Sequence, residues 1–339
     1  MIRSLPFAAA AIALEAGATA QGVGKPIIDM HMHAYELAEF GPEPPRACAG
    51  ANGVVFHGHD PAQPLDFSKL GSCTTMLDAP KTDAALLAET LVAMMRTNIV
   101  LGMISGDRPI VAKFRAAAPD RFLPAAHFFT NGDPPPAAYA IELEKAVKSG
   151  ELKAFGEITA QYRGLSPDHP SLEPFYAMAE RLDVPVGIHM GYGAPAGPYW
   201  IYPKYRASLG NPLLLEELLI RHPKMRVYVM HAALPMVDEL LMLLYSHPQV
   251  YVDISADNWG VPRAEFHRML KQIVEAGYGE RIMFGSDQMV WPSAIDIAIA
   301  SITEANFLTE NQKRDILYNN AARFLRLDKA TIDRHHGRN

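Results

Sequence analysis

The sequence predicts an α/β protein whose eight parallel strands close into a (β/α)8 (TIM) barrel, with a long loop after the first strand and additional helices at the C-terminus. Three observations support this fold. Eight short apolar runs alternate with segments of helical spacing, polar residues follow several of these runs, and 339 residues suit one barrel with long loops. An open doubly wound sheet is the alternative, but the sequence shows neither a glycine-rich phosphate turn nor a clear switch point.

Residues 1–20 have the pattern of an export signal. Arg3 precedes an apolar, alanine-rich run, and a small-x-small cleavage site ends at Ala20. We therefore expect a signal peptide over residues 1–20, an exported, periplasmic protein, and one barrel domain over residues 21–339. The alternative is a cytosolic protein with an alanine-rich leader. The apolar run is too short to span a bilayer, and no later stretch is long and apolar enough.

The first predicted strand is the apolar run that ends in His31 and His33. Residues i and i+2 of a strand point to the same face, so the two imidazoles should project together. The next segment, residues 34–81, is rich in glycine, proline and polar residues, and we expect a long irregular loop that is functional or forms a lid. A second His-x-His pair in it, His57 and His59, is interpreted as a feature of that loop.

Both cysteines of the chain, Cys48 and Cys73, lie in this same segment. In an oxidising compartment they would form a disulfide that closes the loop. In a reducing compartment they would remain two free thiols. The disulfide is therefore expected only if the export signal is real.

From residue 82 onward, helices and strands alternate. Helices are expected over residues 82–97, 109–118, 136–149, 172–182, 212–221, 235–245, 262–276, 293–303 and 310–327. Strands are expected over residues 99–104, 122–128, 153–158, 184–189, 226–231, 250–254 and 281–287. Continuous apolar strands between helices are typical of parallel strands covered on their outer side.

Composition narrows the range of partners. Apolar residues make up 49% of the chain and charged residues 20%, which provides a large core and argues against wholesale disorder. The net charge is −6 and no lysine or arginine cluster is present, so nucleic acid is not an expected partner. A small-molecule substrate is expected instead, and self-association is left open.

Residues that can bind a metal follow the predicted strands. Besides His31 and His33, they are His127, Glu157, His189, His231 and Asp287. In a barrel these strand ends meet at one mouth, where active sites lie. The histidine pair, His189 and Asp287 would form one site for a divalent ion, zinc or alternatively manganese. Glu157 and His231 would extend it to two ions, although Glu157 could instead orient a histidine ligand. For His127 the simpler interpretation is a buried polar residue.

Aromatic residues are concentrated near the same strand ends. The loop after the fifth strand contains Tyr192 and Trp200, and Trp259 and Trp291 follow the last two strands. Beside a metal they would form a wall for an apolar or aromatic substrate; a small core that packs the loop itself is the alternative. Arg163, after the fourth strand, would hold a substrate carboxylate or is a surface residue.

The order of these motifs resembles the amidohydrolase superfamily, and within it the amidohydrolase-related branch. The residues that carry the resemblance are Ile28-Asp29-Met30-His31-Met32-His33, Gly156-Glu157, Ile188-His189-Met190, Val229-Met230-His231, Phe284-Gly285-Ser286-Asp287 and the closing helix around residues 316–325. The resemblance implies that the histidine pair and Asp287 bind the more buried metal. It also implies that His189 and His231 bind a second metal, or that His189 ligates a single metal while His231 polarises the substrate.

Many members of that branch carry a carboxylated lysine where this chain has Glu157. A glutamate excludes that modification and suits two metals bridged by a carboxylate, so a metal-dependent hydrolase is the leading hypothesis. A metal-activated water would attack an ester, lactone or amide carbonyl, with Asp287 moving the proton and His231 stabilising the oxyanion. The branch also resembles non-oxidative decarboxylases of aromatic or dienoic acids, which is the first alternative. A periplasmic metal-binding barrel without catalysis is the second.

Overall fold

The computed structural model describes residues 24–41, 43, 45–66, 69–129 and 135–338. The signal peptide expected over residues 1–20 lies outside these residues, so export stays a prediction. Among the described residues, no helix is long and apolar enough to cross a membrane.

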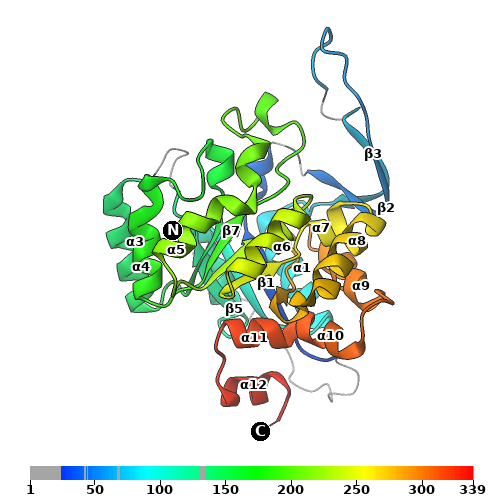
Figure 1. Ribbon diagram of the computed structural model, residues 1–339. Coiled ribbons are helices and arrows are strands. Elements are labelled where there is room, and N and C mark those ends of the chain that lie inside the picture. Colours follow the sequence, from blue (N-terminus) through cyan, green and yellow to red (C-terminus); the bar gives the residue numbers. More distant parts are fainter. Residues whose placement is uncertain (1–23, 42, 44, 67–68, 130–134, 339) are drawn as a thin grey trace, which may run out of the picture.

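Eight parallel strands form a nearly closed barrel, as the sequence predicts (Figure 1). Their order is β1 (Ile27–Ala34), β4 (Ile99–Gly106), β5 (Phe122–Ala126), β6 (Ala154–Ile158), β7 (Val186–His189), β8 (Val227–Met230), β9 (Val250–Asp253) and β10 (Ile282–Met283). Two backbone hydrogen bonds connect the last strand region to the first: Met30 N donates to Phe284 O (2.8 Å), and Asp287 N donates to His31 O (2.7 Å). The barrel mouth is therefore continuous around the histidine pair.

The last strand is shorter than expected. The sequence predicts residues 281–287, whereas β10 ends at Met283. Beyond it, Phe284 N donates to Ile316 O, and Asp287 has a positive φ of 48° that is incompatible with a strand. The apolar run continues beyond the residues of β10 that pair with β9, because the following residues are also buried. Burial alone does not distinguish a strand from an irregular buried segment.

Helices cover the outside of the barrel at the predicted places. They are α1 (Asp83–Arg96), α2 (Arg108–Ala117), α3 (Ala137–Ser149), α4 (Glu173–Arg181), α5 (Glu216–Arg221), α6 (Val237–Ser246), α8 (Arg263–Ile273), α9 (Ala294–Thr303), α10 (Glu310–Arg314) and α11 (Asn320–Phe324). A π-helical turn over Asp315–Asn319 joins α10 to α11, so the helix expected over 310–327 is one run that ends at Phe324. Two short helices, α7 (Asp257–Gly260) and α12 (Lys329–His335), were not predicted.

Threonine caps fix where two of these helices begin. The Thr82 side chain accepts a hydrogen bond from Ala85 N at the start of α1, and Thr309 forms a capping box with Gln312 at the start of α10. Such caps satisfy backbone N–H groups that have no partner within the helix.

The barrel interior is filled below the mouth. Met30, Met103, Tyr228 and Met283 are almost completely buried and belong to one apolar cluster. The Tyr228 hydroxyl donates to Met30 O (3.1 Å), and its ring occupies the space beside Gly187, where a Cβ would lie only 2.5 Å from it. This packing gives the mouth a solid floor and directs function to the carboxyl ends of the strands.

The segment after β1 differs from the irregular loop that the sequence predicts. Strands β2 (Arg46–Phe56) and β3 (Gly71–Asp78) pair antiparallel and project from the barrel (Figure 1). We call residues 46–78 the arm. The glycine and proline content of the segment led to the prediction of an irregular loop. A hairpin depends on how two strands pair with each other, which the composition of one segment does not reveal.

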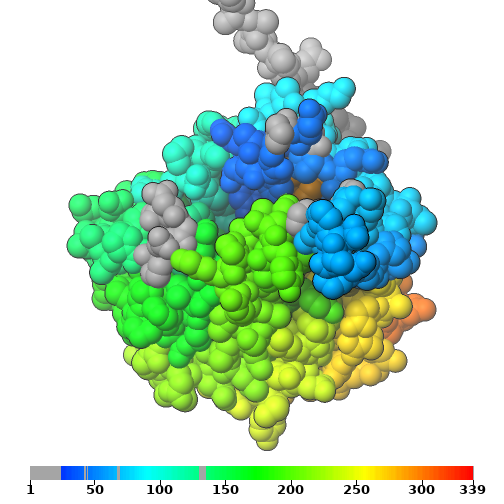
Figure 2. Space-filling view, turned by 90° about the horizontal axis from the view of Figure 1, so that it is seen from above, coloured from blue at the N-terminus to red at the C-terminus, as the bar shows by residue number. Residues whose placement is uncertain are grey.

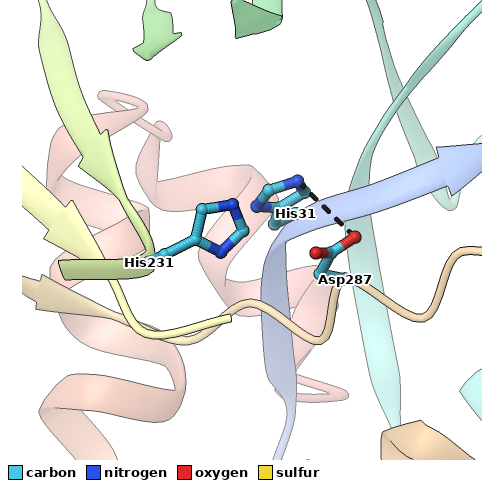
Figure 3. A group of neighbouring side chains, drawn as sticks. All are labelled: His31, His231 and Asp287. Atoms are coloured by element: carbon cyan, nitrogen blue, oxygen red, sulfur yellow. Dashed lines mark ion pairs between the residues drawn. The ribbon is translucent and has the colours of Figure 1, made fainter. Parts of the chain in front are cut away.

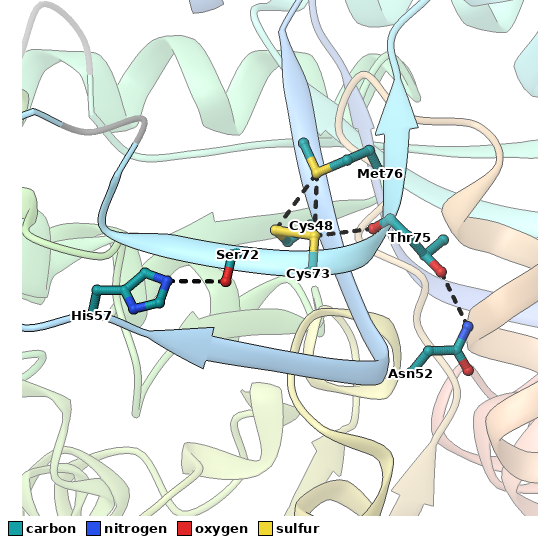
Figure 4. Close-up of a disulfide and its surroundings, with 7 residues drawn as sticks. All are labelled: Cys48, Asn52, His57, Ser72, Cys73, Thr75 and Met76. Atoms are coloured by element: carbon teal, nitrogen blue, oxygen red, sulfur yellow. Dashed lines mark hydrogen bonds between the residues drawn. A yellow bond between two sulfur atoms is a disulfide. The ribbon is translucent and has the colours of Figure 1, made fainter.

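Cys48 and Cys73 form a disulfide within the arm (Figure 4). The second His-x-His pair lies at the far end of the arm, as the interpretation of a loop feature expects, and a hydrogen bond joins His57 Nε2 and Ser72 Oγ (3.0 Å). Neither His57 nor His59 belongs to a group of neighbouring metal-binding side chains among the described residues.

Candidate metal centre

Six side chains predicted from the sequence meet at the barrel mouth, and we call them the centre. They are His31 and His33 of β1, Glu157 of β6, His189 of β7, His231 just after β8, and Asp287 beyond β10. Figure 3 shows His31 between His231 and Asp287. Five of the six are at most 5% exposed, and the Glu157 side chain is 12% exposed.

Four donor atoms on one side of the centre surround a small space. The Nε2 atoms of His31 and His33 are 3.1 Å apart, and Asp287 Oδ1 lies 3.8 Å and 3.0 Å from them. Glu157 Oε2 lies 3.9 Å from His31 Nε2 and 3.6 Å from His33 Nε2. Ligand atoms about 2.1 Å from one ion lie roughly 3.0 to 3.4 Å apart in octahedral or tetrahedral geometry. The observed spacing is close to that of one coordination sphere.

The other oxygen of Glu157 faces two more histidines. His231 Nε2 lies 3.0 Å from Glu157 Oε1, and His189 Nδ1 contacts the same oxygen. Glu157 therefore spans the centre, with one oxygen toward the β1 histidines and the other toward His189 and His231. This arrangement fits a single ion with a carboxylate ligand as well as two ions that share it.

The far nitrogen of each of three imidazoles is held by a fixed acceptor. Asp253 Oδ2 lies 3.1 Å from His31 Nδ1, so that nitrogen can donate to the carboxylate and leave Nε2 free to bind. Two backbone oxygens do the same for the others: Ser255 O lies 3.1 Å from His231 Nδ1, and Tyr192 O lies 2.8 Å from His189 Nε2. In a neutral imidazole, such a contact leaves the nitrogen that faces the centre available to bind an ion.

Asp253 and Ser255 were not identified from the sequence. Asp253 is fully buried, and its Oδ1 accepts hydrogen bonds from His231 N (3.0 Å) and from the Ser255 hydroxyl (2.6 Å). The Ser255 hydroxyl also contacts His31 Nδ1 (2.7 Å). The sequence did contain a signal for Asp253, because it is an acidic residue at the end of the apolar strand β9. The sequence analysis gave weight to the histidines at the other strand ends instead.

The backbone of β1 is tied to the segment that carries Asp287. Asp29 Oδ1 accepts hydrogen bonds from His31 N (3.0 Å) and Ser286 N (2.9 Å). The Gln288 side chain accepts from His33 N (3.1 Å) and donates to His33 O (2.8 Å). Burial raises the pKa of the Asp29 carboxyl to about 7. These bonds hold His31, His33 and Asp287 in one fixed arrangement.

The centre concentrates negative charge that requires a positive partner. Burial opposes ionisation of Asp287 and Glu157, but the neighbouring histidines lower the pKa of both carboxyls. Conversely, burial disfavours the His231 imidazolium, yet Glu157 raises the pKa of His231 to about 10. Asp287 Oδ1 is buried and lies 3.0 Å from His33 Nε2 and 3.8 Å from His31 Nε2. A buried carboxylate oxygen among imidazole nitrogens, with no thiolate beside them, fits a divalent ion that prefers nitrogen and oxygen ligands.

Two tyrosines that the sequence analysis missed, Tyr35 and Tyr162, lie beside the centre. The Tyr35 ring stacks on His33 with centroids 4.5 Å apart, and the Tyr162 ring lies 4.9 Å from His189 and 4.4 Å from Tyr202. Burial, together with the charges of the nearby carboxylates, raises the pKa of Tyr35 and of Tyr162, so both phenols stay neutral. Tyr35 could have been found, because it lies two residues after His33, directly beyond the end of β1, where the alternation of a strand would place both side chains on one side.

The predicted substrate wall divides into exposed and buried parts. Tyr192 and Trp200 are about half exposed at the mouth. Trp259 and Trp291 are almost completely buried, and their indole N–H groups donate to Ser286 O (2.8 Å) and Pro45 O (3.1 Å). Both tryptophans therefore pack beneath the rim, and a direct substrate contact by any of the four residues stays a prediction.

Arg163 and His127 lie at the edge of the mouth. The Arg163 guanidinium lies over the Phe129 ring, 5.8 Å from its centroid, and its Nε is buried without a hydrogen-bond partner. His127 Nδ1 is likewise buried and unpaired, while its Nε2 lies 3.7 Å from Asp107. His127 also lines a cavity of about 490 Å³ at the ends of β4 and β5, which none of the six centre residues lines. Because its Nε has no hydrogen-bond partner, Arg163 keeps a donor for a ligand.

The chain matches known proteins over most of its length. The amidohydrolase family model matches residues 28–327. The gamma-resorcylate decarboxylase of Rhodococcus jostii (strain RHA1) is 27% identical over 254 residues, which cover 65% of this chain and 75% of that protein.

Solved structures share the fold. A probable 2-pyrone-4,6-dicarboxylic acid hydrolase from Acinetobacter baumannii has a TM-score of 0.56 at 14% identity and covers 89% of this chain and 99% of its own. A 5-carboxyvanillate decarboxylase from Novosphingobium aromaticivorans, solved with manganese, has a TM-score of 0.52 at 15% identity and covers 70% of this chain and 79% of its own.

Proposed function

This chain belongs to the amidohydrolase family, and from that premise we propose that it is a metal-dependent, non-oxidative decarboxylase of a phenolic carboxylic acid. The sequence alone favoured hydrolysis because Glu157 suits a bridged pair of metals. The similarity to a curated decarboxylase at 27% identity now favours the alternative. The family is metal-dependent, and the His, Glu and Asp side chains at the mouth are a candidate site for its ion; which ion it is, zinc or manganese, stays open.

The observation that carries the proposal is the compact group of donor atoms around the β1 histidines. The Nε2 atoms of His31 and His33 are 3.1 Å apart, and one oxygen each of Asp287 and Glu157 lies 3.0–3.9 Å from both of them. We assign these residues, together with His189, to hold the ion. When bound, a divalent ion would polarise and orient the oxygens of a substrate that carries adjacent hydroxyl and carboxylate groups.

The chain's own residues would position the substrate. The tyrosine rings beside His33 and His189 offer a wall for an aromatic ring, and the free Nε of Arg163 suits a carboxylate or a phenolic oxygen. Neutral Tyr35 and Tyr162 would add hydroxyl donors, and the bulk of their rings would exclude water. These assignments make the pocket aromatic with a few fixed polar contacts, as is typical of small-molecule sites.

Decarboxylation needs one proton and no oxidant. The bond between the ring and its carboxyl carbon breaks, carbon dioxide leaves, and the electron pair that remains on the ring carbon takes a proton. Asp287 and His231 are the groups placed to deliver it, since each faces the central His31 (Figure 3). Because the neighbouring histidines lower the pKa of Asp287, its carboxylate would first take a proton from the His231 imidazolium, whose pKa is raised to about 10, and we assign the transfer to the ring carbon to Asp287, with His231 also polarising the substrate.

The test is a product assay on metal-loaded protein. Dihydroxybenzoic and carboxyvanillic acids should release carbon dioxide and the corresponding phenol, and Asp287→Asn should slow the release about 10³-fold. Release of an acid from a pyrone lactone, with no carbon dioxide from any aromatic acid, would overturn the proposal in favour of hydrolysis. No turnover on either panel would favour a barrel that binds metal without catalysis.

Hydrolysis remains the second candidate because Glu157 contacts histidines on both of its oxygens. Metal stoichiometry separates the two. Two ions in the wild type that fall to one or none in Glu157→Ala would support a bridged pair and a hydrolytic site. One ion in the wild type supports the mononuclear decarboxylase.

We also propose that the protein is exported, on the leader pattern of residues 1–20 together with a disulfide, which suits an oxidising compartment. N-terminal sequencing of protein produced in a bacterial host should begin at Gln21. Protein that keeps Met1 and stays in the cytoplasm would contradict export.

A further inference from the structure

A cavity lies at the end of the barrel opposite to the arm. It has a volume of about 590 Å³ and is bounded by α11, the turn that follows it, and α12. Figure 1 shows α11 and α12 at the bottom of the barrel and the arm at the top. In Figure 2, which looks onto the end with the arm, the red C-terminal residues are out of sight. None of the six centre residues lines this cavity, so the proposed function does not use it.

Hydrogen bonds and ring contacts fix the helix that closes the cavity. α12 begins at Asp328, whose side chain accepts a hydrogen bond from Thr331 N (2.7 Å). The Tyr318 ring, in the π-helical turn, makes an edge contact with the His336 ring, with centroids 4.9 Å apart. A hydrogen bond also joins the Tyr318 hydroxyl and His335 Nδ1 (3.0 Å). α12 is therefore attached to the barrel, and the cavity has two defined walls.

The lining of this cavity combines basic and apolar side chains. The basic ones are Arg323, Arg326, His336 and Arg338, and the larger apolar ones are Leu327 and Ile332. No acidic side chain of the described residues lines it. A planar guanidinium presents a fork of N–H donors that matches the oxygens of a carboxylate or a phosphate. The lining therefore suits an anion that also carries an apolar part.

The acidic residues next to this cavity do not neutralise its arginines. Asp183 pairs with Arg326 but also with Arg226. Asp333 pairs with Arg338 (3.4 Å) and also with the lysine at the start of α12. Because one carboxylate balances one cation, each of these groups keeps one positive charge.

The other basic residues of the lining add to this positive charge. The Arg323 guanidinium donates to two uncharged oxygens, Glu280 O and Asn320 Oδ1 (both 2.8 Å), whereas the Glu280 carboxylate lies 4.0 Å away. Burial, together with the charge of Arg338, lowers the pKa of His336. The cavity therefore carries a surplus of positive charge.

Arg326 occupies a backbone position where glycine is usual. α11 ends in a Schellman motif, in which Leu327 N donates to Ala322 O (3.0 Å) and Arg326 N donates to Arg323 O (3.0 Å). The residue before Leu327 in this motif has a left-handed backbone, and Arg326 has a φ of 56°. Glycine adopts this conformation without the strain that a Cβ causes. The helix end therefore does not need the guanidinium of Arg326.

We propose that this cavity binds a small organic anion, whose carboxylate or phosphate oxygens contact the three arginines and whose apolar part lies against Leu327 and Ile332. An inorganic anion would leave the apolar lining uncovered, and a neutral apolar molecule would leave the arginine charge unbalanced. The volume lies in the range typical of small-molecule sites. Because the cavity and the centre lie at opposite ends of the barrel, this site does not depend on the proposed decarboxylation.

Arginine modification maps the site on the unaltered protein. Phenylglyoxal reacts with accessible guanidinium groups, and peptide mass spectrometry reads the extent of reaction at each arginine. Millimolar benzoate or phenyl phosphate should slow the reaction of Arg326 several-fold. Arg96 on α1, which is similarly exposed and also pairs with an aspartate, should react at an unchanged rate. Protection of Arg163 alone would restrict the anion to the barrel mouth and would overturn the proposal.

Calorimetric titration with benzoate, phenyl phosphate and inorganic phosphate tests the two parts of the lining. Arg326→Gly should weaken binding of both organic anions roughly tenfold or more, because it removes a charged hydrogen-bond donor while the helix end accepts glycine. Ile332→Ser should weaken both organic anions and leave inorganic phosphate unchanged. Arg96→Gln, the matched control, should change nothing.

Three results of the titrations would overturn the proposal. The first is no binding of any probe by the wild type. The second is equal affinity in the wild type and Arg326→Gly, since binding at the centre alone would not respond to this variant. The third is inorganic phosphate that binds as tightly as phenyl phosphate, which would remove the role of the apolar lining. Circular dichroism identifies any variant that fails to fold, and Arg326→Gly and Ile332→Ser lie on different helical segments, so each checks the other.

Discussion

The centre and the arm are built in opposite ways. The six side chains of the centre come from residues 31 to 287, and buried neighbours on other strands fix them. The arm is a local hairpin over residues 46–78, exposed over its outer half and closed by a disulfide between residues 25 positions apart. Long-range packing holds the centre in place, and a covalent bond holds the arm. We therefore expect each region to tolerate damage to the other.

The largest expected effect is on the centre. Asp287→Asn should lower turnover about 10³-fold, since it removes the proposed proton donor and one ligand. Initial rates of carbon dioxide release and metal content by mass spectrometry would measure this. The arm should be unaffected, so its rate of proteolysis should match that of the wild type. Activity within a few-fold of the wild type would show that Asp287 has no such role.

Loss of the disulfide should have the next largest effect, confined to the arm. For a loop of 25 residues, the chain-entropy model gives about 3.5 kcal/mol of lost constraint. Replacement of Cys48 and Cys73 by serine should therefore accelerate proteolysis within residues 53–73 roughly 100-fold or more. Metal content and turnover should stay unchanged. A parallel loss of metal would break the separation between the two regions.

Asp253→Asn tests the support of the centre without touching a proposed ligand. His31 and His231 lower the pKa of Asp253 although burial opposes it, so this carboxyl is charged and an amide is not equivalent. Metal affinity should fall about 10- to 100-fold, as is usual when a partner that orients a histidine ligand is lost. Competition with a chelator measures this affinity independently of turnover.

Asp257 provides the matched control for Asp253. Both are fully buried near the centre, but burial raises the pKa of Asp257 well above its usual value, and its Oδ2 has no partner. A neutral carboxyl resembles an amide, so Asp257→Asn should leave metal affinity within about twofold of the wild type. Equal losses in the two variants would mean that burial, and not orientation of His31, explains the effect.

The same contrast explains what the sequence could predict. The barrel and its candidate ligands were predictable because apolar periodicity and a polar residue at a strand end are local signals, as at His33 and His189. The roles of Asp253 and Tyr35 depend on which side chains meet across the barrel, which one strand does not encode. Trp259 was assigned to the substrate wall by its chemistry, whereas its burial beneath the rim depends on the complete fold.

The arm shows the opposite limitation. Its disulfide was predicted from cysteine count and compartment, which need no structure. Its strands were missed because Gly50 and Gly53 suggested an irregular loop, while in the structure they permit a close approach and a bend within paired strands. A glycine-rich segment is thus ambiguous until its partner strand is known.

The smallest expected effect concerns a charged group outside both regions. Glu144 on α3 accepts hydrogen bonds from Arg181 (3.0 and 2.8 Å) and pairs with Lys148 (2.6 Å), and these cations lower the pKa of Glu144 from 4.5 to about 2. A lowered pKa in the folded state stabilises the protein above pH 4.5, and this stabilisation is lost as the pH falls toward 2.

Glu144→Gln should therefore lower Tm slightly at pH 7, and the difference from the wild type should shrink as the pH falls from 4.5 toward 3. Molar salt should remove the same difference at pH 7, because exposed pairs are screened. The carboxylates of the centre are also paired with cationic groups, but they are buried, and molar salt should not change the effect of Asp287→Asn on metal content. If salt weakened both effects equally, then charge alone, and not burial, would account for the centre, and the proposed distinction from exposed parts of the molecule would fail.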